Sequence, residues 1–290
     1  MSKPLVSIIV LCYNHSDFVE EAIQSVIHQE YQPIEMIVVD DASSDESVNK
    51  ILKLRQDHSF HFIPNDKNLG NCRSFNQALG LSKGKYVIDL AADDLLLSER
   101  VSIGVEALEN LPEKYGVHFC DTELIDASGN SLGGHYQRNE RGKLIEMVPQ
   151  GEVFSELVRR YFISTPTMMM KKKVLDELGG YDENLTYEDF DFWVRSSRKY
   201  DYAFSDKILV KKRILKKSLS TQQRKPGNKH ALSTAIVCER AFELCENRTE
   251  LLALRARIYY ELKWATVAGN FKAIQKHVNL LRKIVAKLNV

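Results

Sequence analysis

The sequence predicts a doubly wound α/β domain with a mainly parallel β-sheet, followed by a helical C-terminal extension. Residues 5–11 are a continuous apolar, β-branched run, which is typical of a strand buried on both faces of a parallel sheet. Apolar residues at helical spacing follow this run, and the strand–loop–helix unit then repeats. Such alternation favours right-handed crossovers and a parallel sheet. The length of 290 residues allows one large domain, or a domain of about 200 residues with an appendage.

The first half of the chain has the most regular pattern. A helix over 19–27 follows the first strand, and Asp17 and Glu20 form a candidate capping box at its start. Ser43 and Glu46 mark the start of a second helix in the same way. The other elements expected here are strands at 35–40, 60–63 and 86–90 and helices at 47–54 and 73–82.

Beyond residue 94 the pattern is looser. Paired glycines at 179–180 end one helix, because glycine readily adopts the left-handed conformation that stops helices. We expect strands at 116–120 and 167–170, helices at 98–111, 152–161 and 172–178, a hairpin at 126–130, a surface loop over 132–150, a helix opened by 187–193, extended chain over 202–215, a basic loop over 218–229, and C-terminal helices broken near 247–249 and 269–270.

Charge is distributed unevenly along the chain, although the net charge is only +1. Residues 1–206 contain 21 Lys+Arg and 34 Asp+Glu, whereas residues 207–290 contain 19 and 5. This split predicts two parts, a main domain over 1–206 and a basic, mainly helical segment over 207–290. A basic segment of this kind favours phosphate-rich surfaces, either lipid headgroups or nucleic acid.

Cysteine usage and hydropathy indicate a cytoplasmic protein. The five cysteines are scattered without the spacing of a zinc site, which is typical of a reducing compartment. The N-terminus runs directly into a strand and has no signal-peptide pattern. No stretch approaches the roughly 18 to 20 apolar residues of a membrane span. We therefore expect no integral membrane segment, and a peripheral position on a membrane stays open.

Two pairs of adjacent aspartates follow strands. Asp40 and Asp41 end one apolar run, and Asp93 and Asp94 follow another. In an open α/β sheet, ligands bind beyond the carboxyl ends of the strands, and carboxylates brought together there require a shared cation or hydrogen-bond donors. The sequence therefore predicts a polar, metal-assisted site, while the alternative is that these residues only cap helices or turn the chain.

A third acidic cluster, Glu188 and Asp189, stands at a predicted helix start. The helix dipole favours an ionised carboxylate there, and a loop position leaves such a group able to act as a general base. The simpler alternative is that both residues only stabilise the first turn of the helix. Trp193 nearby is interpreted as core or pocket wall.

Taken together, these motifs resemble the inverting nucleotide-sugar glycosyltransferases of family 2, which have the Rossmann-like GT-A fold. The resemblance spans about residues 4–200, and its motifs are specific for the family but not for a substrate. The matching stretches are VSIIVLCYN (6–14), SVIHQ (25–29), EMIVVDDASSD (35–45), NLG (68–70), AADD (91–94), and GGYDE (179–183) followed by Glu188 and Asp189.

The resemblance implies a role for each matching residue. Tyr13 is similar to the ring that packs on the nucleotide base, and Asp41 to the carboxylate that accepts the imide hydrogen of the base. Asp93 corresponds to the residue that contacts the ribose and is a second candidate metal ligand. Asp94 corresponds to the ligand of the Mn²⁺ or Mg²⁺ cofactor between the phosphates. Asp189 matches the general base that deprotonates the acceptor hydroxyl.

The remaining donor-site residues depart from the family pattern or flank it. Cys12 and Asn14 lie on either side of the base-stacking tyrosine and are assigned to the donor pocket with it. The family often has Asp where this chain has Ala91, which predicts modest metal affinity. It also often has Arg where this chain has Phe75. Arg73 is then the candidate to contact the pyrophosphate, with a solvated helix residue as the alternative.

The resemblance therefore implies a metal-dependent, inverting hexosyltransferase. The expected donor is a UDP-sugar, and the expected acceptor is a hydroxyl of a glycan or of a lipid-linked glycan in the synthesis of a bacterial surface polysaccharide such as the O-antigen of lipopolysaccharide. The alternatives are a catalytically degenerate nucleotide-sugar-binding module and a sugar nucleotidyltransferase. The second is disfavoured because no Gly-rich phosphate loop follows the first strand.

The basic C-terminal segment lies outside the resemblance. Apolar positions 274, 278, 281, 285 and 288 keep helical spacing among lysines and arginines. This pattern fits a helix on the anionic inner face of the plasma membrane, and equally a helical cap on the main domain or a homodimer contact. His230 is a further candidate to contact donor phosphates. A nucleic-acid partner is not expected, because no motif of that class is present.

Overall fold

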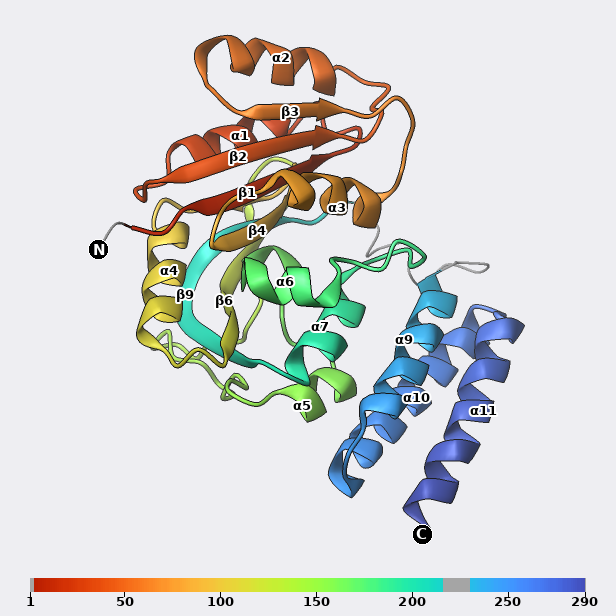
Figure 1. Cartoon of the computed structure of the whole chain (residues 1–290). Helices are drawn as coiled ribbons and strands as arrows, with labels where there is room; N and C mark the ends of the chain where they lie inside the picture. Colours follow the sequence, from red (N-terminus) through yellow and green to blue (C-terminus); the bar gives the residue numbers. More distant parts are fainter. Residues whose placement is uncertain (1–2, 216–229, 290) are drawn as a thin grey trace. The chain divides into compact units, whose positions relative to one another are not determined.

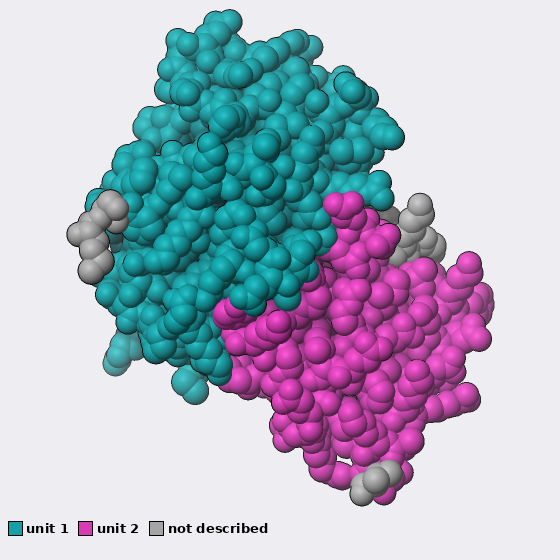
Figure 2. Space-filling model, in the orientation of Figure 1, with its two compact units in different colours: residues 1–151, 163–181, 201–214 teal, residues 152–162, 182–200, 215–290 magenta. Residues whose placement is uncertain are grey.

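The computed structural model describes residues 3–215 and 230–289. It divides into two compact units, drawn in different colours in Figure 2. The first unit consists of Met1–Gly151, Ile163–Tyr181 and Asp201–Ile214, and the second of Glu152–Phe162, Asp182–Tyr200 and Leu215–Val290. The boundary predicted at residue 206 lies within the last strand of the first unit.

Four parallel strands form the first half of the sheet in the first unit. Their order is β3-β2-β1-β4, with β3 at one edge (Figure 1). The strands are β1 (Val6–Cys12), β2 (Ile34–Asp40), β3 (His61–Pro64) and β4 (Tyr86–Ala91). All three pairings are parallel, so the carboxyl ends of these strands meet at one edge of the sheet.

The second half of the sheet is mixed. β8 (Met169–Lys171) pairs antiparallel with β4 and with β6 (Tyr115–Ile125), and β9 (Asp201–Arg213) runs parallel to β6. The short strands β5 (Leu95–Leu96) and β7 (Ser131–Gly134) add antiparallel pairs to β9 and β6. The predicted α/β class is thus confirmed, with a parallel arrangement in the first half of the sheet. β7 also forms part of the region predicted as a surface loop.

Helices at the predicted places connect the strands of the first unit. They are α1 (Val19–Ile27), α2 (Ser47–Asp57), α3 (Asn71–Leu81), α4 (Arg100–Asn110) and α6 (Lys172–Leu178), with a 3₁₀ turn η1 (Thr165–Thr167) before β8. Apolar side chains from β1, β2 and β4 and from α1 share one fully buried core. Gly179 adopts the left-handed conformation and ends α6, as the paired glycines predict.

Both predicted capping boxes are wrong. Phe18 precedes α1 and Glu46 precedes α2, and neither helix start has a side-chain cap hydrogen bond. Asp45 instead accepts hydrogen bonds from the backbone N–H groups of Ser16 and Ser47. It therefore ties the loop before α1 to the start of α2, a tertiary role that a local capping motif does not reveal.

The second unit is helical, which confirms the predicted helical C-terminal region. Its helices are α5 (Phe154–Arg159), α7 (Asp189–Ser197), α9 (His230–Leu244), α10 (Arg248–Val267) and α11 (Phe271–Leu288). α9, α10 and α11 pack on one another, and α10 also contacts α5 (Figure 1). The side chains of Asn247 and Asn270 accept hydrogen bonds from backbone N–H groups of the helices that follow. These N-caps explain the predicted breaks between the C-terminal helices.

Candidate active site

The two acidic pairs lie at the same edge of the sheet, on the strands either side of β1. The backbone N–H of Asp41 donates to the carbonyl of Cys12 at 2.8 Å, and that of Ala92 donates to the carbonyl of Leu11 at 2.9 Å. The segments after β1, β2 and β4 are therefore held next to one another, as expected from the parallel arrangement of these strands.

The loops after β1 and β2 are interlocked in an unusual backbone conformation. Asn14 and Ala42 both have positive φ, at 55° and 62°, and such strain in residues other than glycine is typical of functional loops. The amide oxygen of Asn14 accepts hydrogen bonds from the backbone N–H (2.8 Å) and the hydroxyl of Ser44, while the hydroxyl of Ser43 accepts one from the backbone N–H of Asn14. The shape of these loops is thus fixed.

Tyr13 and Cys12 have opposite environments. The Tyr13 side chain is 48% exposed, so it is available to a flat ligand. Cys12 is buried at the end of β1, and this burial raises the pKa of its thiol to about 12. The thiol therefore stays neutral, and Cys12 can contribute packing but not a thiolate nucleophile.

Asp41 is buried and organises the chain ahead of α3. Its Oδ1 accepts hydrogen bonds from Asn65 Nδ2 at 2.9 Å and from the backbone N–H of Leu69 at 2.8 Å, and its Oδ2 accepts from the backbone N–H of Gly70 at 2.8 Å. A carboxylate has about four acceptor positions, so about one remains for a ligand. Arg73 lies in the first turn of α3 with an exposed side chain.

Asp94 is buried, and its Oδ1 accepts a 2.8 Å hydrogen bond from the backbone N–H of Arg213. Burial and, to a smaller extent, the charge of Asp93 raise the pKa of Asp94 from 3.8 to about 8, although Lys212 and Arg213 oppose these effects. An ionised Asp94 is thus poorly compensated by the surrounding groups and would be stabilised by a bound cation.

Asp93 is more accessible than its neighbour. Its side chain is 13% exposed, and its Oδ2 lies 3.9 Å from Nε2 of His15. His15 follows the interlocked loop after β1 and is itself half-buried, and its Nδ1 atom has no hydrogen-bond partner among the described residues. No sequence pattern assigns a role to His15, although this residue directly follows the motif that ends at residue 14.

Arg213 is a second residue that the sequence pattern does not single out, because it is one of many basic residues in the segment over 207–290. It is buried at the end of β9, and its guanidinium donates to the backbone carbonyls of Asp93, Asp126 and Ala127 and to Oε2 of Glu21. The buried guanidinium of Arg213 thus holds the turn that carries the acidic pair. Lys216 and Lys217, which follow Arg213 in the basic segment, lie outside the described residues.

The described residues are compatible with a divalent metal whose remaining ligands come from the substrate. No group of three His, Cys, Asp or Glu side chains within 3–215 and 230–289 could hold a metal ion by itself. Mg²⁺ and similar ions are often bound by one or two carboxylates together with substrate phosphates. Asp94, whose buried carboxylate lacks full compensation, and the adjacent Asp93 form such a donor set.

Asp189 lies in the second unit, as the first residue of α7. Its Oδ1 accepts a 2.6 Å hydrogen bond from the backbone N–H of Phe190. The Phe190 ring contacts that of Tyr161 at a centroid distance of 5.2 Å, and the guanidinium of Arg257 lies 3.9 Å from the Tyr161 centroid and 4.8 Å from that of Phe190. A residue of α10 thus packs against the start of α7, a contact that the sequence analysis did not predict.

His230 begins α9 in the same unit. Its Nδ1 lies 2.8 Å from Oγ1 of Thr186, which belongs to the segment before α7. Burial lowers the pKa of His230 below its usual value of 6.5, so the neutral imidazole is favoured at pH 7. Its suggested contact with donor phosphates stays a prediction, and the basic loop predicted over 218–229 lies outside the described residues.

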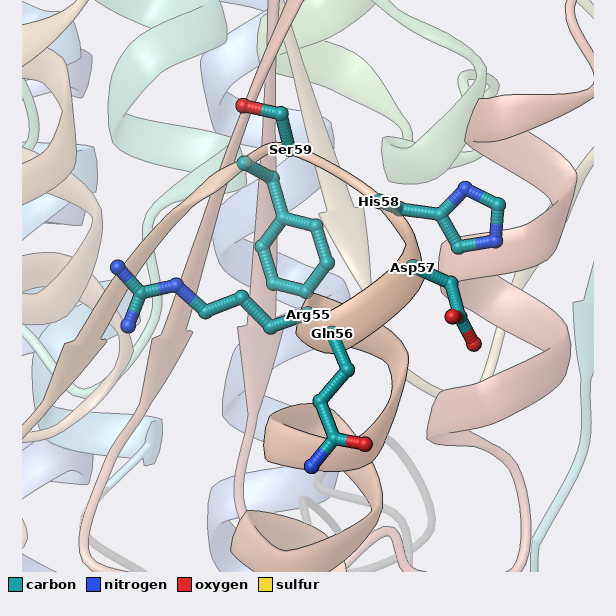
Figure 3. A pocket seen from close by; sticks show the side chains of 6 residues that line it. Arg55, Gln56, Asp57, His58 and Ser59 are labelled. Atoms are coloured by element: carbon teal, nitrogen blue, oxygen red, sulfur yellow. The ribbon is translucent and has the colours of Figure 1, made fainter.

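A surface depression near the end of α2 lies away from these residues. Figure 3 shows that its side chains point in different directions and do not converge on a common point. Its residues come just before β3 in the sequence and so lie at the amino end of that strand, whereas the candidate site lies at the carboxyl ends of the parallel strands. We therefore assign it no role in the site. Its lining residues are Arg55, Gln56, Asp57, His58, Ser59 and Phe60.

The chain matches the family model described as glycosyl transferase family 2 over residues 7–179, which is more than half of its length. It belongs to this family, and it is a glycosyltransferase by that membership. Within the described residues, no helix is long and apolar enough to cross a membrane.

Relatives in other organisms are similar over the same region. The chain is 32% identical over 224 residues to an uncharacterized glycosyltransferase of Methanocaldococcus jannaschii, which covers 74% of this chain and 72% of the relative. It is 32% identical over 220 residues to one of Rickettsia prowazekii, with 73% and 64% covered. It is 26% identical over 184 residues to the poly-beta-1,6-N-acetyl-D-glucosamine synthase of Staphylococcus epidermidis, with 63% and 43% covered. The chain thus spans less than two thirds of the last two relatives.

Solved structures share the fold. Residues 1–349 of S. aureus TarS in complex with UDP-GlcNAc superpose with a TM-score of 0.73 at 16% identity, which covers 97% of this chain and 80% of that one. A mannosyltransferase of Pyrobaculum calidifontis in complex with GDP-Man and Mn²⁺ gives a TM-score of 0.63 at 16% identity, with 99% and 88% covered. These likenesses establish the GT-A fold.

Proposed function

We propose that this chain transfers a sugar from a nucleotide-sugar donor, a UDP-sugar, to a hydroxyl of a glycan or lipid-linked acceptor in surface polysaccharide synthesis. The observation that carries the donor site is the convergence of the interlocked loops after β1 and β2 with the acidic pair Asp93–Asp94 at one sheet edge. Two of the solved structures with this fold hold UDP-GlcNAc or GDP-Man, which supports the same class of donor.

In this proposal the base of the donor lies between a ring and a carboxylate. Tyr13 offers a half-exposed aromatic face for stacking. Asp41, whose oxygens already accept three hydrogen bonds from the protein, has about one acceptor position left for the imide N–H of the base. Cys12 and Asn14 fix the backbone on either side of the stacking ring, and Asp93 accepts from a ribose hydroxyl.

The diphosphate is assigned to the acidic pair. Asp94, with Asp93 as a second ligand, would hold Mn²⁺ or Mg²⁺, and the cation would neutralise charge that develops on the nucleoside diphosphate leaving group. The mannosyltransferase with this fold is in complex with GDP-Man and Mn²⁺, which supports a divalent metal for this chain as well. Arg73, in the first turn of α3, is proposed as a pyrophosphate contact.

Asp189 is proposed as the general base. Its position at the first residue of α7 stabilises an ionised carboxylate through the helix dipole, so it can take the proton of the acceptor hydroxyl. The hydroxyl oxygen then forms a bond to the anomeric carbon as the bond to the diphosphate oxygen breaks. Attack on the side opposite the leaving group inverts the anomeric centre without a covalent intermediate.

The test is turnover of the donor. Purified protein with Mn²⁺ is incubated with UDP-glucose, UDP-galactose, UDP-GlcNAc or GDP-mannose and a membrane lipid extract, and release of the nucleoside diphosphate is followed. We expect release from one donor that requires both metal and extract. Binding of a donor without release under any condition would favour a degenerate binding module, and release of a nucleoside triphosphate on addition of pyrophosphate would favour a nucleotidyltransferase.

We further propose that the acceptor is reached at the inner face of the plasma membrane by a cytoplasmic protein that binds the membrane peripherally. Nine lysines and arginines and two glutamates occupy residues 248–290, a balance that favours anionic surfaces.

A further inference from the structure

The apolar face predicted on the last helix is largely covered within the second unit. Leu288 is buried, and Ile274, Val278 and Leu281 are half-buried, so that only Val285, at 40%, is exposed. α11 packs on α9 and α10. The apolar side of α11 thus packs within the second unit, and it is not the surface that is open to a partner.

Exposed apolar side chains gather instead on the opposite side of α10. Tyr259, Tyr260 and Val267 follow Leu252 by seven, eight and fifteen residues. These spacings correspond to about two and four turns of a helix, so the four side chains share one face. Phe271, which begins α11 four residues after Val267, is 81% exposed. We call this set the α10 stripe. Its members are Leu252, Tyr259, Tyr260, Val267 and Phe271, which are 37%, 55%, 47%, 67% and 81% exposed.

The charge around the α10 stripe has one sign. Lys263 is exposed four residues after Tyr259, and Lys272 is exposed next to Phe271. The two glutamates of this region, Glu250 and Glu261, are turned away into ion pairs with Arg198 and Arg257, at 3.0 Å and 3.2 Å. No other acidic residue occurs in 248–290. Within 248–290, the exposed surface at the stripe therefore combines aromatic and apolar groups with basic side chains.

We propose that the α10 stripe docks on an anionic lipid bilayer, with its aromatic and apolar side chains at the interface and Lys263 and Lys272 at the lipid phosphates. Tyr suits such an interface because its ring is apolar while its hydroxyl stays hydrated, and Phe and Val can insert as apolar groups. Each basic side chain near an anionic leaflet adds affinity. This inference deepens the membrane part of the proposed function and rests on it.

Charge also distinguishes this partner from a second copy of the chain. Two copies that met through the α10 stripe would bring Lys263 and Lys272 of both chains together, while the two glutamates of 248–290 stay paired with Arg198 and Arg257, and like charges at an interface oppose association. An anionic bilayer compensates them. The ion pair between Arg257 and Glu261 lies on the buried side of α10, so docking through the stripe leaves the packing of the unit unchanged.

The test is co-sedimentation of the full chain with vesicles of phosphatidylcholine alone or mixed with phosphatidylglycerol, at low and high salt. We expect binding only to the mixed vesicles and only at low salt. Lys263→Glu/Lys272→Glu should weaken binding by at least about tenfold, since one lysine contributes roughly fivefold. Tyr259→Ser/Val267→Ser/Phe271→Ser should weaken it similarly, through lost insertion of the stripe.

Matched controls come from the first unit. Met147→Ser removes an apolar side chain that is 91% exposed, and Lys53→Glu reverses an exposed charge on α2; both should bind like the wild type. Each variant is checked for an unchanged thermal unfolding transition. Absence of binding to the mixed vesicles, equal binding to neutral vesicles, or stripe variants that bind like the controls would overturn the proposal.

Light scattering without lipid tests the rival partner, because a dimer that the stripe variants dissociate would assign the surface to a second copy and overturn the lipid proposal. Failure of the docking proposal is also distinguishable from failure of the proposed function. The residues proposed to bind the base and the metal lie in the first unit, and none of these variants changes His230, so donor binding with Mn²⁺ should be unchanged in all of them.

Discussion

The backbone N–H of Arg213 donates a 2.8 Å hydrogen bond to Oδ1 of Asp94. Through this contact and the hydrogen bond from the Arg213 guanidinium to the carbonyl of Asp93, the end of β9 holds the turn after β4. The candidate metal ligand is thus positioned by a residue far along the chain, and the same arginine provides a buried positive charge below the acidic pair.

Arg213→Lys should destabilise the first unit. The guanidinium donates to three backbone carbonyls and to Glu21. The compact ammonium group of lysine cannot reach all of these acceptors at once. We expect the free energy of unfolding, measured in urea, to fall by about 2 to 4 kcal/mol. Arg141→Lys, at an exposed loop position, is the matched control and should change stability by less than about 0.5 kcal/mol. An equal effect of the two changes would remove the structural role of Arg213.

Gly180→Ala should cost more stability than a glycine with the same backbone conformation elsewhere. Gly180 has φ of 74°, and an added Cβ would lie 2.3 Å from Oδ1 of Asn76. The Asn76 side chain cannot simply rotate away from this clash, because its amide is hydrogen-bonded to both the backbone N–H and the carbonyl of Tyr181. Gly142 has φ of 73° and open space around it.

We expect Gly142→Ala to lose about 1 to 2 kcal/mol from the left-handed conformation alone, and Gly180→Ala to lose at least about 1 kcal/mol more from the clash. Urea unfolding of both variants measures the difference. Equal losses would mean that the contact between Gly180 and Asn76 does not constrain this turn.

Asp89 should make stability depend on pH. Burial raises the pKa of Asp89 from 3.8 to about 7, an effect opposed by the hydrogen bond from the Tyr181 hydroxyl. Between these two values the folded protein binds more protons than the unfolded chain, so the contribution of Asp89 to stability is fully present below about pH 4 and is lost as pH rises through about 7.

Asp89→Asn removes this titration. The wild type should lose on the order of 2 kcal/mol of stability between pH 5 and pH 8 that the variant does not lose. Urea unfolding of both proteins at the two pH values gives the comparison, and a stability difference that does not change with pH would contradict the assignment.

Asp189→Asn should lower the transfer rate by about 10² to 10⁴ and leave donor affinity nearly unchanged, because a general base acts on the acceptor in the transition state. The rate is followed by nucleotide release and the affinity by calorimetry with the donor. Asp176→Asn, on the partly exposed side of α6 in an i,i+4 pair with Lys172, is the control and should keep full activity. Full activity in Asp189→Asn as well would rule out this residue as the base.

The sequence was sufficient to predict the elements whose signals are local. The buried runs of β1, β2 and β4 lie within one or two residues of their predicted bounds, and the aspartates that follow them lie at one sheet edge because parallel strands bring their ends together. Gly179 also ends α6 as predicted, since its role depends only on its own backbone conformation.

Contacts between distant segments could not be predicted in this way. Nothing in a Lys-Lys-Arg run indicates that its arginine will be buried against a turn 120 residues earlier. Nor does the three-residue strand β8 carry a signal for its antiparallel insertion between β4 and β6. The capping box expected at 43–46 failed for the same reason, because the hydroxyl of Ser43 donates to Asp40 and accepts from the backbone N–H of Asn14 and does not cap the helix.

The central claim is that the loops after β1, β2 and β4 bind a nucleoside diphosphate together with a metal. It is tested most directly by thermal unfolding of the wild type and of Asp94→Asn with UDP, TDP, GDP or CMP, each with and without Mn²⁺. A ligand at about 100 times its dissociation constant adds about 2.7 kcal/mol, so we expect a rise of the unfolding temperature with UDP that requires Mn²⁺ and is absent in Asp94→Asn. No rise with any nucleotide, or an equal rise in both proteins, would contradict the claim.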